Sequence, residues 1–198
     1  TFIRFEVEST IETETGSWRM RVYTDTLHNK EHVALVKGDI DPLTPVLVRV
    51  HSESLAGDVF ASIQYDDGRQ LRKAMEMIEA QGTGVLVYLR EEGRGIGLAN
   101  TIRAYKLQQE ECLDTVEANE RLGFAPDLRE HGIGAQILKD VGVGHLRILT
   151  NNPKKVVALD GYGLHIAEQV PIQVEAASET ERQYLQTKKN RMGHTISD

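Results

Sequence analysis

Two segments in which a helix pattern leads into an apolar strand restrict the fold of this chain most. Leu71, Met75 and Ile78 recur at helical spacing, and the apolar run 85–89 follows after a Gly-Thr-Gly break. The same order of helix and strand returns over residues 133–150. Because an amphipathic helix must bury its apolar face against another element, the sequence predicts a mixed α/β (α+β) domain.

The first sixty residues are rich in strand signals. Alternation at residues 3–7 and a turn at 15–17 predict a hairpin. The other elements that we expect are strands over 32–36 and 46–50, a helix over 96–113, a helix that Pro153 begins behind Asn151 and Asn152, and a last helix from a capping box at 178–181 to Gly193. Without a linker, repeat or composition break, we expect a single domain over residues 1–198. Because Thr1 lies so close to a strand, we expect the domain to be part of a longer chain.

The charge balance argues against a nucleic-acid partner. Lys and Arg number 23 against 30 Asp and Glu, a net charge of -7, whereas nucleic-acid surfaces are usually basic. An anionic ligand must therefore be held by local basic residues. The single cysteine, Cys112, excludes a disulfide framework, and no apolar run reaches membrane-spanning length. These features predict a cytoplasmic protein with no membrane partner.

The strand at 46–50 places ionisable groups on one side. Its valines share one face, and Arg49, His51 and Glu53 project from the other at steps of about 7 Å. A solvated strand face explains such a triplet on its own, so a functional interpretation needs further sites.

Two turns that open helices have the chemistry of anion sites. Residues 90–97 (REEGRGIG) lead into a helix whose first N–H groups can attract phosphate, and Arg94 adds charged donors. The glycine spacing matches neither the P-loop nor the dinucleotide fingerprint, so a structural turn is an equal alternative. Residues 150–155 (TNNPKK) put two lysines in a first helical turn, which is unfavourable unless an anion is bound there. The turns favour a triphosphate or a similar ligand.

Six motifs in this order resemble those of the GTP cyclohydrolase II family. They are residues 49–53 (RVHSE), 88–98 (YLREEGRGIGL), 102–105 (IRAY), 114–119 (DTVEAN), 149–155 (LTNNPKK) and 192–194 (MGH), and the resemblance runs from about residue 9 to residue 194. The family begins riboflavin synthesis by opening the imidazole ring of GTP, with release of formate and pyrophosphate. In many bacteria it is the C-terminal half of a bifunctional protein whose N-terminal half makes dihydroxybutanone phosphate, which would account for a chain that begins at Thr1.

The resemblance implies a role for each matching residue. The nucleotide-binding positions are Arg49, Glu53, Gln70, Glu92, Gly93, Arg94, Tyr105, Thr115, Thr150 and Lys155, with Gln70 and Tyr105 near the base. Asp127 matches the proton acceptor, and Arg129 matches the nucleophile toward the α-phosphate, assisted by Mg²⁺. An ordinary surface ion pair also explains these last two residues. The resemblance further implies GTP or a related purine nucleotide as ligand and a homodimer.

The zinc-binding cysteines of the family are missing. The family binds a catalytic zinc ion through the pattern C-x10-C-x-C, and this chain has Ser54, Tyr65 and Asp67 at those positions. Zinc lowers the pKa of bound water from 15.7 to about 7, which these three residues cannot match. We therefore expect zinc to be absent, and Ser54, Tyr65 and Asp67 to lie close together. Their oxygen atoms could hold Mg²⁺ only weakly.

Three functions stay open on these observations. The first is a GTP cyclohydrolase II-like nucleotide-binding domain whose ring-opening step is impaired or lost, with residual hydrolysis of GTP phosphate esters. The second is a non-catalytic dimerising or regulatory domain of a bifunctional riboflavin protein with a fused dihydroxybutanone phosphate synthase domain. The third is an active cyclohydrolase with an unusual metal site. Asp127, Arg129 and Lys155 favour the enzymes over a scaffold.

Overall fold

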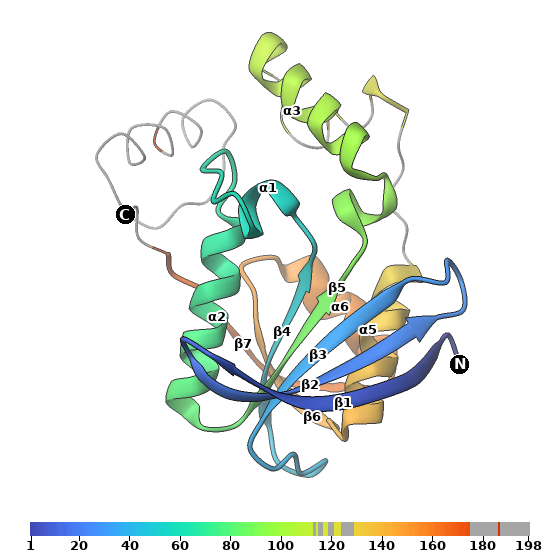
Figure 1. Ribbon diagram of the computed structural model, residues 1–198, viewed down its shortest axis with the longest axis vertical. Coiled ribbons are helices and arrows are strands. Elements are labelled where there is room, and N and C mark those ends of the chain that lie inside the picture. Colours follow the sequence, from blue (N-terminus) through green and yellow to red (C-terminus); the bar gives the residue numbers. More distant parts are fainter. Residues whose placement is uncertain (113, 115–116, 119–120, 124–128, 175–185, 187–198) are drawn as a thin grey trace. The chain divides into compact units, whose positions relative to one another are not determined.

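The computed structural model describes residues 1–112, 114, 117–118, 121–123, 129–174 and 186 (Figure 1). The chain forms two compact units. The sheet unit consists of Thr1–Ser52, Leu71–Arg90 and Leu128–Ile172, and the second unit of Glu53–Gln70, Glu91–Asp127 and Gln173–Asp198. The helix expected from the capping box at 178–181 lies outside the described residues.

The sheet unit contains a seven-stranded mixed sheet, which confirms the predicted α/β class. Its order, across the described residues, is β1-β2-β3-β5-β4-β6-β7. The antiparallel strands are β1 (Ile3–Thr13), β2 (Gly16–Asp25) and β3 (Glu31–Lys37), and the parallel strands are β4 (Val46–Ser52), β5 (Gly84–Leu89), β6 (His145–Leu149) and β7 (His165–Val170). β3 and β5, which pair antiparallel, join the two sets. The parallel part can therefore present several strand ends at one edge.

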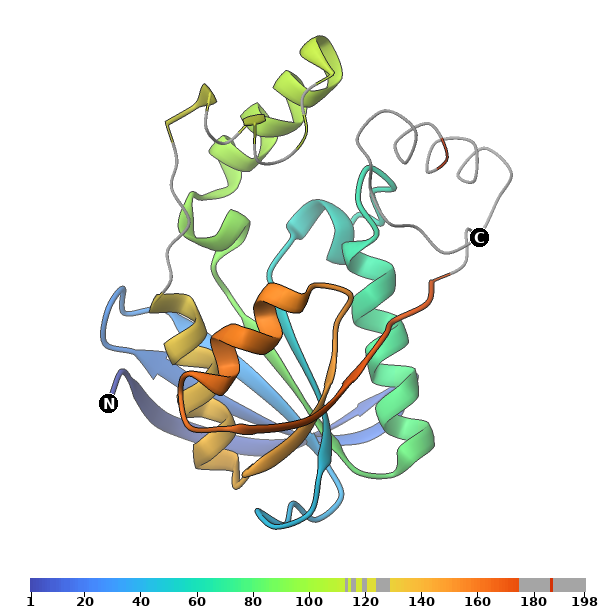
Figure 2. The same ribbon diagram turned by 180° about the vertical axis from the view of Figure 1, so that it is seen from behind.

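Helices from the chain's second half cover the parallel strands. α5 (Arg129–Val141) and α6 (Pro153–Asp160) lie on the same face (Figure 2). Ile137, Leu138 and Leu159 from these helices are buried in one cluster with the β4 valines. The helix α2 (Asp67–Gln81) buries Ile78 completely, against Gly84 at the start of β5. A Cβ at Gly84 would come within 2.6 Å of the Ile78 side chain, so only glycine allows this approach.

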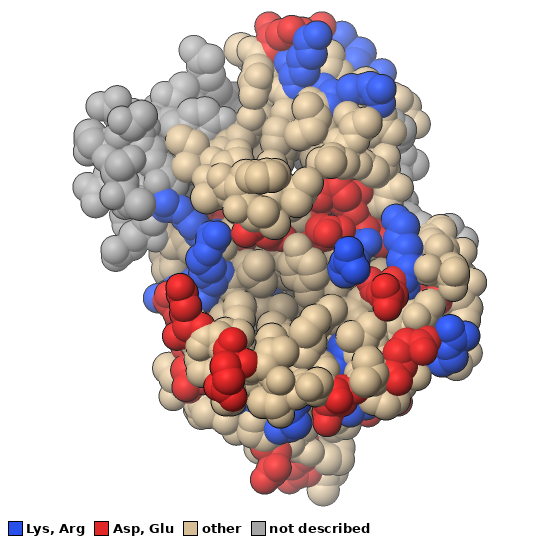
Figure 3. Space-filling view, in the orientation of Figure 1, with Lys and Arg blue, Asp and Glu red and all other residues tan. Residues whose placement is uncertain are grey.

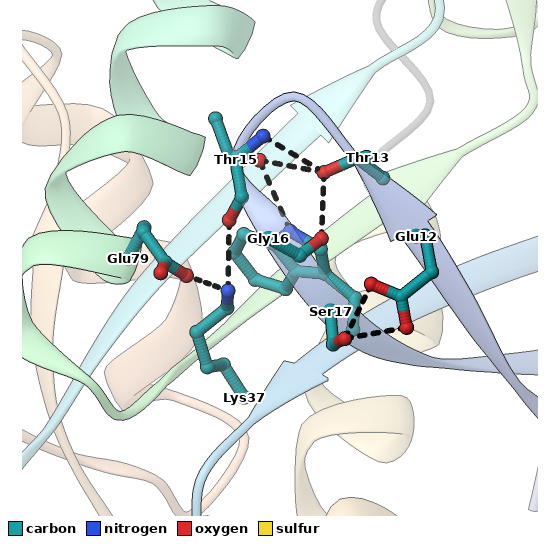
Figure 4. Close-up of polar contacts among 8 residues, drawn as sticks. Glu12, Thr13, Thr15, Gly16, Ser17, Lys37 and Glu79 are labelled. Carbon is teal, nitrogen blue, oxygen red and sulfur yellow. Dashed lines mark hydrogen bonds and ion pairs between the residues drawn. The ribbon is translucent and has the colours of Figure 1, made fainter.

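Polar contacts fasten the hairpin of β1 and β2 to α2 (Figure 4). Lys37 donates to the carbonyl oxygen of Thr15 over 2.8 Å, forms an ion pair with Glu79 of α2, and lies 4.4 Å from the centroid of the Trp18 ring. The Thr13 hydroxyl donates a hydrogen bond to the Gly16 carbonyl oxygen over 3.0 Å. The hairpin turn is thus held both within itself and against the helix.

Several expected elements differ in detail from those observed. The strands predicted at 32–36 and 46–50 exist, but β5 lies between them. The helix predicted over 96–113 is α3 (Leu98–Glu111), preceded by the 3₁₀ turn η1 (Glu92–Gly95), because glycines with positive φ interrupt the helical path. Two elements were not expected, the edge strand β7 and the short helix α1 (Leu55–Asp58).

Candidate functional site

The sheet unit has a topological switch point at the carboxyl ends of β4 and β6. The chain leaves β4 toward β5 on one side, and leaves β6 toward β7 on the other. Ligands of open α/β sheets bind outside the carboxyl ends of strands at such a point. Arg49 bridges it, since its Nη1 donates to the carbonyl oxygen of Leu149 over 3.1 Å. The fold thus places two of the candidate nucleotide-binding residues beside this point, Arg49 on β4 and Thr150 directly after the end of β6.

The ionisable face of β4 is buried. Arg49 is 6 % exposed and His51 is 2 % exposed, so the alternative of a solvated strand face is wrong for these two residues. His51 stacks on Tyr88 of β5, with ring centroids 5.6 Å apart and an interplanar angle of 18°. Thr150 is buried too, and its hydroxyl accepts a hydrogen bond from the Asn152 N–H over 3.0 Å. These polar side chains, in β4 and just after the end of β6, are therefore buried rather than exposed on a solvated surface.

The second unit builds a polar cluster around the start of α1. The Ser54 N–H donates to Asp58 over 3.0 Å, and the Leu55 N–H donates to Glu92 over 3.0 Å. A Cβ at Gly57 would lie 3.3 Å from the Ser54 hydroxyl oxygen and 3.2 Å from the Asp67 Cβ. Ser54 and Asp67, two of the three zinc-ligand positions, are therefore neighbours, as expected.

Tyr65, at the remaining zinc-ligand position, has a different partner. Its hydroxyl donates to the Gln108 side chain of α3, and its ring lies 5.2 Å from that of Tyr105. A second bond, from Gln109 to Gln64 over 2.6 Å, holds the same segment to α3. The Tyr65 hydroxyl is therefore engaged by α3, and the expected proximity of all three positions is supported directly only for Ser54 and Asp67.

Carboxylates give this cluster a negative character. Burial raises the pKa of Glu92, the Leu55 N–H opposes that rise, and the charges of Glu53, Asp58 and Asp67 add to it. Burial also raises the pKa of Tyr105 to about 12; the neighbouring Ser54 hydroxyl opposes this rise, and nearby carboxylates add to it. The Tyr105 phenol thus stays protonated at neutral pH and can donate a hydrogen bond.

The zinc ion of the family does not fit these residues. Ser54 offers a buried neutral hydroxyl, Tyr65 a phenol that already donates to Gln108, and Asp67 a single carboxylate. Protein zinc sites are built mainly from thiolates and imidazoles, which bind zinc more strongly than neutral oxygen donors. The donor set at these positions is that of a weak site for a hard cation at most.

The glycine-spaced turn before α3 is held by its own backbone. Gly93 and Arg94 have φ angles of 62° and 59°, and the N–H groups of Arg94 and Gly97 donate to the carbonyl oxygens of Glu91 and Glu92, each over 3.0 Å. The N-cap of α3, Gly97, provides no side-chain cap for the helix. An anion at this turn would thus meet the first N–H groups of α3 and the exposed Arg94 rather than every N–H of the turn.

Some candidate residues have no described side chain. Thr115 and Asp127 lie outside the described residues. Arg129 is the first residue of α5 and Lys155 lies in the first turn of α6, but their side chains are not described. Gln70 lies in the first turns of α2, where its N–H donates to the Asp66 carbonyl oxygen over 2.9 Å.

Sequence reasoning missed a buried pair, Asp25 and His32, at the end of β2 and the start of β3. Both side chains are fully buried, and Asp25 Oδ2 lies 2.6 Å from His32 Nε2. The only signal in the sequence is an acid and a histidine on either side of the short segment 26–31, which leads into the strand predicted at 32–36.

On the face shown in Figure 3, basic and acidic side chains are interspersed, so that face has no continuous basic field.

The strand order and the covering helices define a mixed α/β domain with a topological switch point at the carboxyl ends of its parallel strands. Comparison with known proteins identifies it further: the family model for GTP cyclohydrolase II matches residues 4–171, and the chain belongs to that family. In the described part of the chain, no helix has the length and apolar character needed to cross a membrane.

The chain is similar to curated riboflavin biosynthesis proteins. It is 57% identical over 197 residues to the riboflavin biosynthesis protein RibBA of Bacillus cereus (strain AH187) and to that of Bacillus cytotoxicus, with 100% of this chain and 49% of each relative covered. The chain thus spans about half the length of these relatives. The crystal structure of RibBX, a two-domain 3,4-dihydroxy-2-butanone 4-phosphate synthase from A. baumannii, matches with a TM-score of 0.50 and 24% identity over 86% of this chain and 40% of that one. This last match supports the fold alone.

Proposed function

We propose that this chain is a GTP cyclohydrolase II-like domain of riboflavin biosynthesis that binds GTP or a related purine nucleotide, and in which the ring-opening step is impaired or lost. One observation carries the proposal: oxygen donors stand at the three zinc positions, while Arg94 and the uncapped start of α3 remain to hold phosphate. Mg²⁺ accompanies the nucleotide, and the protein is a cytoplasmic homodimer. If Asp127 and Arg129 act on the α-phosphate, residual hydrolysis of the phosphate ester survives the loss of zinc.

The second candidate is a non-catalytic dimerising or regulatory domain. The chain's match to about half of each RibBA relative favours it, because the other half of such a protein could carry an activity that this domain supports. An active cyclohydrolase with an unusual metal site is the third candidate, which the 57% identity to RibBA favours.

Incubation with GTP and Mg²⁺, followed by identification of the products, separates the three. We expect no formate and either unchanged GTP or GMP with pyrophosphate. Formate with a pyrimidine product would establish a working cyclohydrolase. Unchanged GTP without measurable nucleotide binding would favour the non-catalytic domain.

The first prediction concerns zinc. After dialysis against a chelator, the purified protein should retain far less than one zinc ion per chain, because Ser54, Tyr65 and Asp67 supply no thiolate. Elemental analysis measures the content. The RibBA protein of Bacillus cereus, treated in parallel, is the comparison. Stoichiometric zinc that survives the chelator would show that our account of the metal site is wrong.

The second prediction concerns nucleotide binding. A non-hydrolysable GTP analogue should bind, and Arg94→Ala should weaken binding by about 1–3 kcal/mol, the range for hydrogen bonds to charged groups. Lys155→Ala should have a similar effect, as the sequence motif predicts. Calorimetry measures both. Arg4→Ala is the matched control, because Arg4 is an exposed arginine of the edge strand β1, paired with Glu6. Equal losses in the Arg4 and Arg94 variants would contradict a local phosphate site.

A further inference from the structure

Two histidines face each other at the start of the neighbouring parallel strands β6 and β7. His145 and His165 are register partners, and the His165 N–H donates to the Gly144 carbonyl oxygen over 3.0 Å. The next residue of β6, Leu146, is fully buried and points to the opposite face. His165 is exposed and His145 is partly exposed. Both imidazoles therefore lie on the side of this strand pair that solvent can reach.

The separation of the two rings matches that of two ligands of one metal ion. Their centroids are 4.9 Å apart with an interplanar angle of 64°. Metal–nitrogen bonds to imidazole are about 2.0–2.1 Å long, so two imidazoles that share a tetrahedral ion have ring centroids about 5 Å apart. A simple edge-to-face contact between aromatic rings allows a wider range of centroid separations, about 4.5–7 Å, which also includes the observed 4.9 Å.

The tautomer of His145 is suited to metal binding. Its Nδ1 lies 2.9 Å from the carbonyl oxygen of Pro42. A carbonyl oxygen only accepts hydrogen bonds, so Nδ1 carries the proton and the Nε2 of the neutral ring keeps its lone pair. Histidines that bind metals almost always donate their other ring N–H in this way, often to a backbone carbonyl.

The charged pair that follows the two histidines along the strands does not oppose a cation. Arg147 and Glu168, which lie two register pairs further along the strands, form an ion pair over 2.9 Å. The positive guanidinium is therefore neutralised by its own partner. The whole chain has a net charge of -7.

We infer that His145 and His165 form a two-histidine site for a divalent transition-metal ion such as Cu²⁺ or Zn²⁺, with water in the remaining coordination positions. Imidazole suits both ions, and Cu²⁺ binds more tightly than Zn²⁺ at a given nitrogen site. The site is independent of the proposed nucleotide function: its ligands belong to the sheet unit, whereas Ser54, Tyr65 and Asp67 belong to the second unit. With only two protein ligands, it should release its metal to a chelator.

Titration of the metal-free chain with Cu²⁺ tests this inference. Calorimetry should show one tightest site per chain, and electron paramagnetic resonance should show hyperfine structure from two nitrogen ligands. His165→Phe keeps a ring against His145 but removes the nitrogens, and it should lower the affinity by more than about tenfold, because even the partners of metal ligands are worth 10–100-fold. His145→Gln should do the same, and Zn²⁺ should compete for the same site.

A matched control separates this site from metal binding at other histidines. His28 is an exposed histidine of the same unit, so His28→Ala should leave the tightest site unchanged. Circular dichroism and the unfolding midpoint confirm that each variant is folded. Unchanged copper affinity in both the His145 and the His165 variants, a signal from a single nitrogen, or the absence of saturable binding would each overturn the inference.

Discussion

Replacing Ser54, Tyr65 and Asp67 together with cysteine should create a zinc site in a chain that we expect to retain little zinc after chelation. The three thiolates would stand at the family spacing and leave a fourth tetrahedral position for water. Ser54 and Asp67 are already neighbours across Gly57. Replacing Tyr65 removes a phenol that is hydrogen-bonded to Gln108, so residue 65 is the position whose surroundings must rearrange. We expect about one zinc ion per chain by elemental analysis, after the same dialysis as the parent.

Formate release from GTP by this triple variant should rise above the parent but stay below a RibBA relative. Groups that orient metal ligands are each worth about 10–100-fold, and Gln108, Tyr105 and Glu92 surround these positions in place of partners suited to thiolates. The double variant Ser54→Cys with Tyr65→Cys, which supplies only two thiolates, is the control and should hold little zinc. A triple variant that binds zinc and GTP but releases no formate would show that the pocket differs beyond its metal, and would favour the non-catalytic domain.

The second large effect is expected at the buried pair of Asp25 and His32. His32 Nδ1 accepts the Arg90 N–H over 3.0 Å, so its Nε2 carries the proton that Asp25 accepts. Asp25 also accepts the His28 N–H over 2.6 Å. Asp25→Ala leaves a buried donor without its acceptor, and should lower the free energy of unfolding by about 3 kcal/mol or more. Urea denaturation measures the loss.

Two variants and the pH dependence check this account of Asp25. Asp25→Asn keeps the shape and one acceptor and should lose less than Asp25→Ala, while Asp39→Ala, at an exposed carboxylate, should stay within about 0.5 kcal/mol of the parent. Burial alone would raise the pKa of Asp25, but the His28 N–H and His32 outweigh it and hold that pKa below its usual value. The stabilisation should therefore be complete above the usual aspartate pKa and disappear as the pH falls through the lowered value. Equal stability of Asp25→Ala and Asp39→Ala would contradict the role of the pair.

Much of the fold could be predicted because it depends on local patterns. The spacing of Leu71, Met75 and Ile78 predicts α2, and the apolar run at 85–89 predicts β5, since each pattern reflects which face of an element is buried. The edge strand β7 escaped prediction because its residues are largely exposed and lack a clear alternation. The placement of β5 between β3 and β4 escaped as well, because strand order depends on contacts between distant segments.

By itself, the sequence determined the class of the fold, the family motifs and the absence of the zinc-binding thiolates. The type of a residue does not depend on its surroundings, so no packing can turn Ser54, Tyr65 and Asp67 into thiolates. Only the tertiary structure decided that Arg49 and His51 are buried, that the Tyr65 hydroxyl bonds Gln108, and that His145 meets His165. The physical reason is that burial, hydrogen-bond partners and ring contacts arise between elements far apart in the chain, and strand order and register set which side chains meet.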